Sequence, residues 1–273
     1  MTDTNDGARP VGDTVGYTVA DQVATITLQR PEAMNALDRA TKDALRAAVE
    51  QAASDADVRA VLLTGAGRAF CVGQDLREHV AALDELTAEE LWSTVADHYT
   101  PIATGLATMP KPVVAAVNGV AAGAGASMAF ACDVRVLADT ASFNTAFAAI
   151  GLSCDTGVSW TLPRLVGHAR AVDLLYNPRS VDAAEAERLG LANKVVPAES
   201  LAEEAGALAR RLAAGPTLAY ASIRQALAYS ATHGLAESLV NEGKNMARTG
   251  ASQDHSDAVA AFVAKQPPEF HGR

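Results

Sequence analysis

The chain has 273 residues, of which 49% are hydrophobic and 20% are charged, and its formal net charge is −10. This length can bury a substantial core, as one large domain or as a domain with an appendage. The negative charge disfavours a general role on nucleic acids or anionic membranes, although local donors can still bind an anionic small molecule. Apolar runs such as Val113–Val117 are far shorter than the roughly 20 residues that span a membrane.

The N-terminal segment and the cysteines indicate a cytoplasmic protein. Residues 1–14 are polar and lack the basic and apolar regions of a signal peptide, so a disordered tail is predicted there. Cys71, Cys132 and Cys154 cannot form a closed set of disulfides, and their spacing matches no zinc template. We therefore expect reduced thiols, a cytoplasmic location and no bound metal.

Strand and helix patterns alternate through the first part of the chain. Two strand-like pieces within Tyr17–Leu28 predict a hairpin. Asp38, followed by apolar residues at helical spacing, predicts a helix that runs through Ala53. A buried strand, a loop and a second helix are then predicted at Ala60–Thr64, Gly65–Asp75 and Ala88–Ala107.

The alternation continues in the middle of the chain and then gives way to helices. Val113–Val117 and Val134–Ala138 are predicted as buried strands on either side of a helix at Ala126–Ala131. Residues 183–197 indicate a short helix, a glycine stop and a strand, and the pattern from about Glu199 onward is helical. Alternating strands and helices predict an α/β fold with helices covering the sheet. We place the core at residues 15–199 and a helical region at residues 200–273.

Two segments share one layout, in which a buried strand leads into a glycine-containing turn. They are VLLTGAGRAFCVGQDL at Val61–Leu76 and NGVAAGAGASMAFACD at Asn118–Asp133. Glycine permits a positive φ and a close approach of the backbone to a ligand. A helix N-terminus also leaves backbone N–H groups without internal partners. If the two turns converge, they offer two backbone donors to one oxygen atom.

The second turn resembles a dinucleotide-binding fingerprint only in part. Gly123 and Gly125 form a G-x-G pair, but Met128 stands where the third glycine is required. Phe143 and Asn144 occupy the place of the expected acid, and the chain has no Gly-Lys-Ser/Thr phosphate loop. A purely structural role, in which the glycines let a helix pack tightly on a strand, stays open.

Five segments together resemble one known family, the crotonase or enoyl-CoA hydratase/isomerase superfamily, in its order and spacing. They are RPEAMNAL (Arg30–Leu37), AFCVGQDL (Ala69–Leu76), KPVVAAVNGVAAGAGA (Lys111–Ala126), AAEAERLGLANKVVP (Ala183–Pro197) and AFVAKQPPEF (Ala261–Phe270). The resemblance covers roughly residues 15 to 270. It implies a crotonase (ClpP-like) spiral of ββα units whose C-terminal helices form a homotrimer, or a hexamer made of two trimers.

The resemblance also implies a reaction and two donors. Family members bind acyl-CoA thioesters and stabilise an enolate oxyanion with two backbone N–H groups, which correspond here to the amides of Gln74 and Ala124. Each preorganised donor of this kind contributes about 3–4 kcal/mol to transition-state stabilisation. A backbone donor tolerates any side chain except proline, so Gln74 is compatible, whereas Ala124 has to avoid a positive φ.

The same resemblance implies which residues bind coenzyme A, which enters as part of the substrate, with no separate cofactor. Two residues near the C-terminus of a neighbouring subunit are implied to contact the adenine or phosphate end of coenzyme A. A lysine near a C-terminus is also typical of ordinary solvated surface. The implied residues are Glu32, Ala33, Met34, Ala69, Val72, Gln74, Asp75, Leu76 and Ala124, with Phe262 and Lys265 as the C-terminal pair.

The acid and base of a hydratase are missing from this sequence. Hydratases of the family carry two glutamates at positions that correspond here to Ser127 and Phe147, and neither of these is a general base near neutral pH. Asp155 is the only carboxylate in Phe143–Gly167. It aligns with the aspartate of the isomerase branch, above all the epoxyphenylacetyl-CoA isomerase group of phenylacetate degradation. We therefore predict an isomerase that shifts a β,γ double bond or rearranges a ring.

One carboxylate is enough for such a shift, because it removes a proton from the α-carbon and returns it to the γ-carbon. Partial desolvation would raise the pKa of Asp155 toward that of a useful base. A turn-capping role for Asp155 stays open. So does a covalent role for Cys154, and so does a second polar group in the acyl pocket from His98 or Glu78.

Three rival functions remain at this point. One is a hydratase with an unrecognised base, and another is a non-catalytic acyl-CoA-binding protein. A dehalogenase that uses Asp155 as a nucleophile also needs a histidine base and a tryptophan, and Phe147 stands at that tryptophan position.

Overall fold

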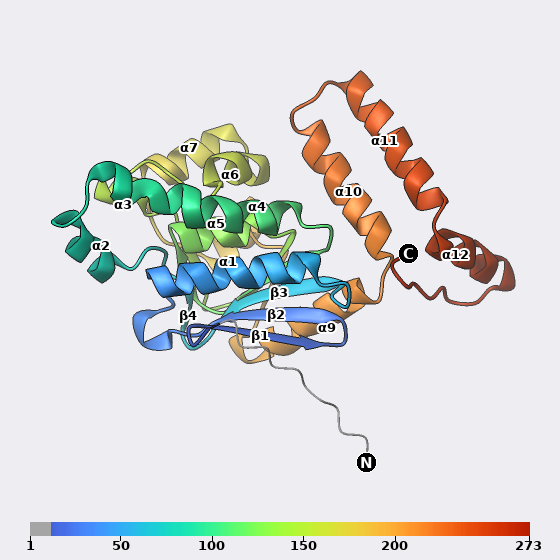
Figure 1. Cartoon of the computed structure of the whole chain (residues 1–273), viewed down its shortest axis with the longest axis horizontal. Helices are drawn as coiled ribbons and strands as arrows, with labels where there is room; N and C mark the ends of the chain where they lie inside the picture. The colour runs from blue at the N-terminus through green and yellow to red at the C-terminus, as the bar shows by residue number, and fades with distance from the viewer. Residues whose placement is uncertain (1–11) are drawn as a thin grey trace, which may run out of the picture.

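The computed structural model describes residues 12–273 (Figure 1). Residues 1–11, the greater part of the predicted tail, lie outside the described residues. The larger of two sheets has the strand order β1-β2-β3-β5-β7-β10. Only β1 runs antiparallel to its neighbour, and the other pairs are parallel. Its strands are β1 (Val15–Ala20), β2 (Val23–Leu28), β3 (Ala60–Gly65), β5 (Val113–Val117), β7 (Val134–Ala138) and β10 (Lys194–Val196).

A second sheet of four short strands has the order β4-β6-β8-β9. Its strands are β4 (Ala69–Cys71), β6 (Val120–Ala122), β8 (Ser142–Asn144) and β9 (Val181–Asp182). In the pairs β3–β4, β5–β6 and β7–β8, the chain passes directly from the first sheet to the second, and helices follow each pair. This repeat confirms the predicted α/β spiral of ββα units. It also brings the ends of β4 and β6 side by side, because these two strands are paired.

The first helix forms where the sequence predicts it. Helix α1 spans Arg39–Ser54, and the Asp38 side chain caps it by accepting from the Thr41 amide at 2.8 Å. Its apolar side chains are buried where α1 packs on β1 and β2. A capping carboxylate and an apolar stripe are both local signals, so the sequence contains them directly.

Residues 76–108 differ from the prediction, which had one helix at Ala88–Ala107. The structure has α2 (Leu76–Leu83), α3 (Ala88–Thr94), a π-helical turn η2 (Val95–Tyr99) and α4 (Thr100–Thr108). Helix α2 lacks a core-facing stripe, and its Leu76, Val80 and Leu83 are exposed. These three residues recur at helical spacing, and Asp75 caps α2 by accepting from the amides of Arg77 and Glu78, so the sequence held signals for this helix that the prediction omitted.

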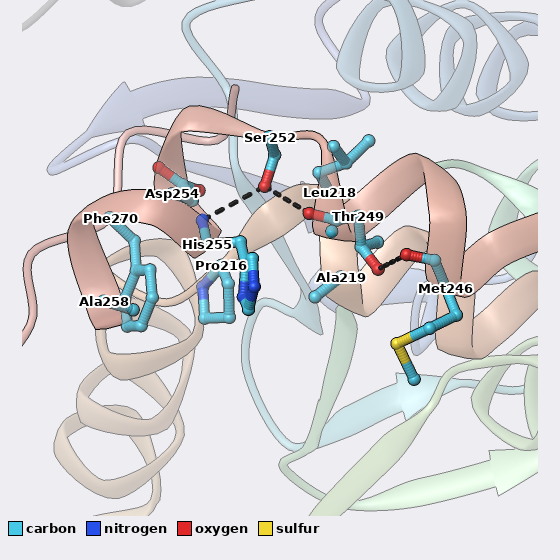
Figure 2. Close-up of a pocket in the computed structure, with 11 residues that line it drawn as sticks. Pro216, Leu218, Ala219, Met246, Thr249, Ser252, Asp254, His255, Ala258 and Phe270 are labelled. Atoms are coloured by element: carbon cyan, nitrogen blue, oxygen red, sulfur yellow. Dashed lines mark hydrogen bonds between the residues drawn. The ribbon is translucent and has the colours of Figure 1, made fainter. Parts of the chain in front are cut away.

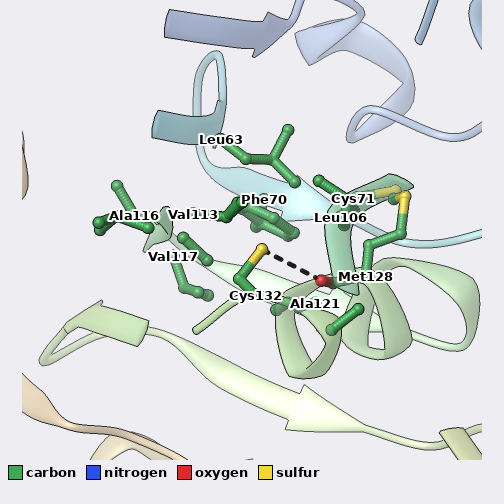
Figure 3. Packing of buried hydrophobic residues seen from close by; sticks show 14 of the residues in the cluster. Leu63, Phe70, Cys71, Leu106, Val113, Ala116, Val117, Ala121, Met128 and Cys132 are labelled. Carbon is green, nitrogen blue, oxygen red and sulfur yellow. Dashed lines mark hydrogen bonds between the residues drawn. The ribbon is translucent and has the colours of Figure 1, made fainter. Parts of the chain in front are cut away.

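The hydrophobic core lies between the sheets and around α5 (Ala124–Ala131), as Figure 3 shows for residues that include Phe70, Leu106 and Met128. Every residue of α5 is buried. The helix begins two residues before the predicted Ala126, directly after the glycine turn. Because α5 is enclosed on all sides, its first turn has a fixed place relative to β4, with which it is in contact.

The remaining helices surround the spiral or extend from it. Helix α9 packs on β3, β5 and β7, whereas α10, α11 and α12 project from the core and form what we call the C-terminal arm (Figure 1). Arg59 holds the base of the arm by donating to Thr217 Oγ1 at 2.8 Å and to the Gly215 carbonyl at 2.5 Å. The bounds are η1 (Pro31–Ala33), η3 (Phe147–Ile150), α6 (Val158–Val166), α7 (His168–Tyr176), α8 (Ala183–Leu189), η4 (Ala198–Ser200), α9 (Leu201–Ala213), α10 (Thr217–Ser230), α11 (Leu235–Gly250) and α12 (Gln253–Ala264).

Candidate active site

The first glycine turn connects β4 to α2. Gly73 has a φ of 83°, and its carbonyl accepts from the Leu37 amide at 2.8 Å. The Asp75 amide donates to the Leu37 carbonyl at 3.1 Å, so Gln74 lies between two bonds to the same residue. Successive amides of an extended segment point to opposite sides, and the Gln74 N–H therefore points away from Leu37.

The second glycine turn connects β6 to α5. Gly123 takes the positive φ of this turn, 51°, and its amide donates to the Asn144 carbonyl at 2.9 Å. Ala124 is the first residue of α5 and has no positive φ. The backbone conformation that an alanine disfavours is therefore taken by the glycine before it. The Ala124 N–H, in the first turn of a helix, has no partner within that helix.

The two turns are in contact through their backbones. A Cβ atom on Gly73 would lie 3.0 Å from the Ala122 carbonyl oxygen and 3.2 Å from the Ala124 nitrogen. A Cβ atom on Gly125 would lie 2.1 Å from the Cys71 carbonyl oxygen, so only glycine fits there. Tight packing of helix on strand thus explains Gly125, whereas Gly123 meets nothing within 4 Å and serves the turn itself.

The predicted donors are both available at this junction. Within residues 12–273, neither the Gln74 nor the Ala124 amide donates to a protein acceptor. Both follow strands that pair with one another, and Ala124 also stands at the positive end of the α5 dipole. Such a pair of donors can hold one oxygen atom that gains negative charge during a reaction.

Asp155 lies in the tight turn before α6. Thr156 has a φ of 52° and Gly157 a φ of 78°. A positive φ at a β-branched residue costs on the order of 1–3 kcal/mol, so packing has to hold this turn in place. Helix α6 has no side-chain cap, and the Asp155 carboxylate instead accepts from the Thr156 hydroxyl at 2.7 Å. The Asp155 carboxylate thus does not cap α6 and instead bonds within its own turn.

Asp155 is linked electrostatically to the first turn through Tyr99. Burial raises the pKa of Asp155, and the hydrogen bond from Thr156 opposes that rise. Burial also raises the pKa of Tyr99, and the charge of Asp155 raises it further. The Tyr99 hydroxyl donates to Gln74 Oε1 at 2.5 Å. A buried phenol thus bonds to the side chain of the residue that carries the first predicted donor, and the charge of Asp155 affects the pKa of that phenol.

The two positions that hold glutamates in hydratases have no acid–base group here. Ser127 is fully buried, and its hydroxyl donates to the Gly123 carbonyl at 2.9 Å within the first turn of α5. Phe147 is also buried, in η3. These side chains build the turn and the core, whereas Asp155 is half-buried and has a raised pKa.

Comparison with known proteins agrees with this arrangement. Residues 18–273 match the family described as enoyl-CoA hydratase/isomerase. The chain belongs to the enoyl-CoA hydratase/isomerase family. It is 41% identical over 95% of its length to a Rhodobacter capsulatus protein described as a probable enoyl-CoA hydratase, of which 98% is covered. It is 40% identical over 92% of its length to the 1,2-epoxyphenylacetyl-CoA isomerase of Escherichia coli, of which 95% is covered.

The structural comparison agrees as well. The crystal structure of an enoyl-CoA hydratase/isomerase candidate from Mycobacterium abscessus matches with a TM-score of 0.91 and 44% identity. That match covers 95% of this chain and 100% of the other. The fold prediction is therefore confirmed by both sequence and structure. Members of the family act on acyl-CoA thioesters. The amides of Gln74 and Ala124 therefore lie in a fold whose members process this class of substrate.

The predicted coenzyme A residues of this family member fall into two groups. Glu32, Ala33 and Met34 lie in and after η1. This loop is tied to the segment after β3, because the Asn35 side chain donates to the carbonyls of Ala66 and Ala69. It therefore lies beside the continuous segment that contains the other predicted residues, Ala69, Val72, Asp75 and Leu76.

The second group, Phe262 and Lys265, lies in and directly after α12, at the other end of the molecule from α2 (Figure 1). Phe262 is 83% exposed. One chain alone thus does not bring these two residues to the glycine turns.

A cavity of about 290 Å³ borders Gln74. Lys42, Thr94 and His98 line it together with Gln74, and side chains of α2 and α3 form its walls. The sequence prediction omitted Lys42, although its position three residues before Leu45 places it on the apolar face of α1. A lysine among the buried apolar residues of a helix is unusual, and this pattern could have identified Lys42. The complete lining is Arg39, Lys42, Gln74, Glu78, His79, Ala82, Leu86, Glu90, Leu91, Trp92, Ser93, Thr94, Asp97 and His98.

Figure 2 shows a larger cavity, of about 420 Å³, within the C-terminal arm. Its lining is mostly apolar and includes Leu218, Met246 and Phe270. The carboxylate of Asp254 accepts from the amides of His271 and Gly272 and so anchors the C-terminal residues. No residue of the two glycine turns lines this cavity.

The described residues provide neither a metal site nor a membrane-spanning helix. Among residues 12–273, no group of three histidine, cysteine or acidic side chains could hold a metal ion. None of the helices in this range has the length and apolar content needed to cross a membrane. The three cysteines are free, and burial raises the pKa of both Cys71 and Cys132 to about 12, so these two thiols stay protonated.

Proposed function

We propose that this enoyl-CoA hydratase/isomerase family member is an isomerase with Asp155 as its acid and base. It would move a β,γ double bond of an acyl-CoA into conjugation with the thioester, or isomerise a ring-epoxide acyl-CoA. One observation carries the proposal. Asp155 is a half-buried carboxylate with a raised pKa, whereas Ser127 and Phe147 stand at the positions that the family resemblance assigns to the acids of a hydratase.

In the proposed reaction, the thioester oxygen accepts from the amides of Gln74 and Ala124. Asp155 removes a proton from the α-carbon, and the electron pair of that C–H bond forms the dienolate, whose charge rests on the thioester oxygen. The protonated Asp155 then returns its proton to the γ-carbon, and the double bond becomes conjugated. No water is consumed, so a second acid–base group is not required.

The environment of Asp155 suits this role. Burial raises the pKa of its carboxyl group, which makes the carboxylate a stronger base than an exposed aspartate. The hydroxyl of Thr156 keeps the carboxylate oriented by donating to Oδ1 at 2.7 Å. Proton transfer by a positioned group of this kind typically contributes about 10²–10⁴-fold to the rate.

The named relatives support both this activity and one competitor. The Escherichia coli relative at 40% identity is a 1,2-epoxyphenylacetyl-CoA isomerase, and the Rhodobacter capsulatus relative at 41% is described as a probable enoyl-CoA hydratase. A hydratase is therefore the second candidate, and it would need a further base in the cavity beside Gln74. A protein that binds acyl-CoA without turning it over is the third.

We also propose which residues bind coenzyme A and how the subunits assemble. The loop Glu32–Met34 and the segment Ala69–Leu76 would hold the coenzyme, and Phe262 and Lys265 would reach it from a neighbouring subunit of a trimer or hexamer. The arm supports this proposal, because its apolar side chains Met246, Phe262 and Val263 are 72%, 83% and 77% exposed. Side chains of this kind are typical of a surface that another chain covers.

The test compares the protein with its Asp155→Asn variant on 3-hexenoyl-CoA and 2-hexenoyl-CoA. We expect the protein to convert the 3-enoyl thioester to the 2-enoyl thioester. The variant should lose about 10²–10⁴-fold in kcat with little change in KM, because only proton transfer is removed. Asp139→Asn is the matched control, since Asp139 is exposed on the loop after β7.

The other outcomes separate the three candidates. Isomerisation that survives in Asp155→Asn would remove Asp155 from the mechanism. Addition of water to 2-hexenoyl-CoA would establish the hydratase. Tight binding of both thioesters without turnover of either would support the non-catalytic protein.

A further inference from the structure

The first glycine turn is joined to the segment before α1 by an isolated parallel bridge between Leu37 and Gln74. Its two hydrogen bonds run from the Leu37 amide to the Gly73 carbonyl at 2.8 Å and from the Asp75 amide to the Leu37 carbonyl at 3.1 Å. These bonds direct the Gln74 N–H away from Leu37. Each neutral hydrogen bond adds little net stability, so the bridge needs further support to keep that direction.

The side chain of Arg30 contacts both segments of this bridge. Its Nη1 donates to the Ala36 carbonyl at 2.6 Å, and Ala36 directly precedes Leu37. The same nitrogen donates to Asp75 Oδ2 at 3.0 Å, and Asp75 directly follows Gln74. One guanidinium group therefore joins the two segments at the positions next to the bridge, and it opposes their separation.

The backbone of Arg30 is itself fixed, so the side chain extends from a defined point. The Arg30 amide donates to Asn35 Oδ1 at 2.9 Å, and its carbonyl accepts from the Asn35 amide at 2.8 Å. Asn35 is fully buried and has a φ of 57°, a conformation that asparagine tolerates better than most residues. Its side chain also donates to the carbonyls of Ala66 and Ala69. The base of Arg30 is thus tied to the segment between β3 and β4.

The carboxylate that accepts from Arg30 stays ionised. Burial would raise the pKa of Asp75, but the hydrogen bonds from Arg30 and from the amides of Glu78 and Arg77 outweigh burial and lower it. The side chains of Arg30 and Asp75 are 18% and 11% exposed. Asp38 Oδ2, 3.2 Å from Nη1, is a second anionic partner of the same guanidinium. Hydrogen bonds between charged groups are roughly twice as strong as neutral ones, so this pair supports the bridge more than either of its backbone bonds does.

We propose that Arg30 is a positioning residue for the proposed reaction, which holds the bridge between Leu37 and Gln74 so that the Gln74 N–H points at the thioester oxygen. The inference rests on the proposed function, because that function assigns this N–H to the oxyanion. Arg30 acts through the turn and takes no part in proton transfer.

A positioning role of this kind affects the transition state more than the binding of the substrate. A preorganised donor stabilises the developing oxyanion without having to reorient during the reaction. If the Gln74 N–H loses its direction, the charge on the thioester oxygen is less well stabilised, whereas the contacts to the rest of the acyl-CoA are unchanged. The loss therefore appears in kcat and in the polarisation of the thioester carbonyl.

The first test observes the thioester carbonyl and requires no turnover. Difference infrared spectroscopy follows the carbonyl stretch of bound hexanoyl-CoA that is isotopically labelled at the carbonyl carbon, a saturated thioester that cannot isomerise. Donors at the oxygen weaken the C=O bond, so we expect the unmodified protein to lower the stretching frequency. Arg30→Met, which has a similar length and no donor, should lose part of that lowering, because only the Ala124 amide keeps its direction. Its affinity for hexanoyl-CoA should change little.

The second test measures steady-state kinetics on 3-hexenoyl-CoA. We expect Arg30→Met to lower kcat about 10- to 100-fold with little change in KM, because displacing a catalytic group by about 1 Å can cost about 100-fold in rate. Arg30→Lys retains a cation that can donate to one of the two segments. This conservative variant should recover part of kcat and part of the infrared shift.

Arg224→Met is the matched control. The Arg224 side chain is 11% exposed, and it donates to the carbonyls of Leu106 and Lys111 and to the carboxylate of Asp133. None of these acceptors adjoins Gln74 or Ala124 in the chain. This variant should lose stability in denaturant titration, as Arg30→Met does, and yet keep the infrared shift. The comparison separates loss of a largely buried guanidinium in general from loss of Arg30.

Two results would overturn the inference and leave the isomerase proposal intact, namely a full infrared shift in Arg30→Met and an equal loss of the shift in Arg224→Met. If Arg30→Met does not fold, Arg30→Lys decides, since an intermediate shift supports the inference and a full shift contradicts it. Failure of the isomerase proposal is a different result, the absence of double-bond migration by the unmodified protein on 3-hexenoyl-CoA, and it does not alter the infrared comparison.

Discussion

The glycine turns and the adjoining cavity present different groups, backbone at the turns and side chains in the cavity. At the turns, Gly73, Gly123 and Gly125 set the positions of backbone N–H groups. In the cavity, side chains such as Lys42 and Trp92 form the lining. The difference teaches that the turns depend on backbone geometry, whereas the cavity depends on side chains that can change without disturbing the turns.

Among changes to the turns, the largest effect should come from removing one backbone donor. Gln74→Pro deletes the N–H, and we expect kcat to fall about 10²–10³-fold, the usual result of losing one oxyanion donor. Gln74→Ala keeps the N–H and should change kcat far less, because only the side-chain bonds to Lys42 and Tyr99 are lost. Steady-state kinetics on both variants would distinguish the two contributions, and equal losses would contradict a backbone donor at this position.

A smaller effect is expected from filling the contact between the turns. Gly125→Ala would place a methyl group against the Cys71 carbonyl, where an ideal Cβ would lie 2.1 Å away. Overpacking of this kind costs about 1–3 kcal/mol in the free energy of unfolding. Denaturant titration would measure the loss, and activity should fall as well because α5 carries Ala124.

Gly206→Ala in α9 is the control for that substitution. Its Cβ would meet only the flexible end of Arg210, at 3.2 Å. Alanine is the better helix former, so this variant should gain roughly 0.5–1 kcal/mol. Equal destabilisation by both alanines would show that the contact between Gly125 and the Cys71 carbonyl is not unusually tight.

The smallest effect concerns pH. Burial raises the pKa of Asp155 in the folded protein, and the proposed base is active only when ionised. The kcat/KM profile should therefore fall on the acid side at a higher pH than for an exposed aspartate, and Asp155→Asn should lose that limb. A limb unchanged in the variant would assign it to another group.

The raised pKa of Asp155 also affects the stability of the fold, which it lowers at neutral pH. Because the folded protein holds the Asp155 proton more tightly than the unfolded chain, this group favours the folded state below its unfolded pKa. That advantage is lost as the pH rises through the folded pKa, so ionised Asp155 destabilises the fold at neutral pH. Asp155→Asn should accordingly raise Tm at neutral pH, the exchange of stability for activity that functional groups often show.

Some structure could not be predicted from the sequence because its signal is not local. Helix α2 has apolar residues at helical spacing, but they are exposed, so the stripe does not show what the helix packs against. The predicted single helix at Ala88–Ala107 contains the π-helical turn Val95–Tyr99, which buries both His98 and Tyr99. No periodicity rule predicts that insertion, although such turns often occur at functional sites.

Within the region predicted as helical from residue 200, the sequence pattern does not separate α9 from the arm. Both have apolar faces, but α9 buries its face on the sheet and α10–α12 leave many apolar side chains exposed. A hydrophobic stripe indicates that a helix needs a partner and does not identify the partner.

The sequence by itself determined the alternation of strands and helices, the two glycine turns and the absence of acids at Ser127 and Phe147, since all of these are matters of local pattern and residue type. Only the tertiary structure decided that Gly73 meets Ala124 and that the Tyr99 hydroxyl bonds to the side chain of Gln74. These contacts join segments far apart in the chain, and they arise because paired strands and a fully enclosed helix leave each turn a single place to lie.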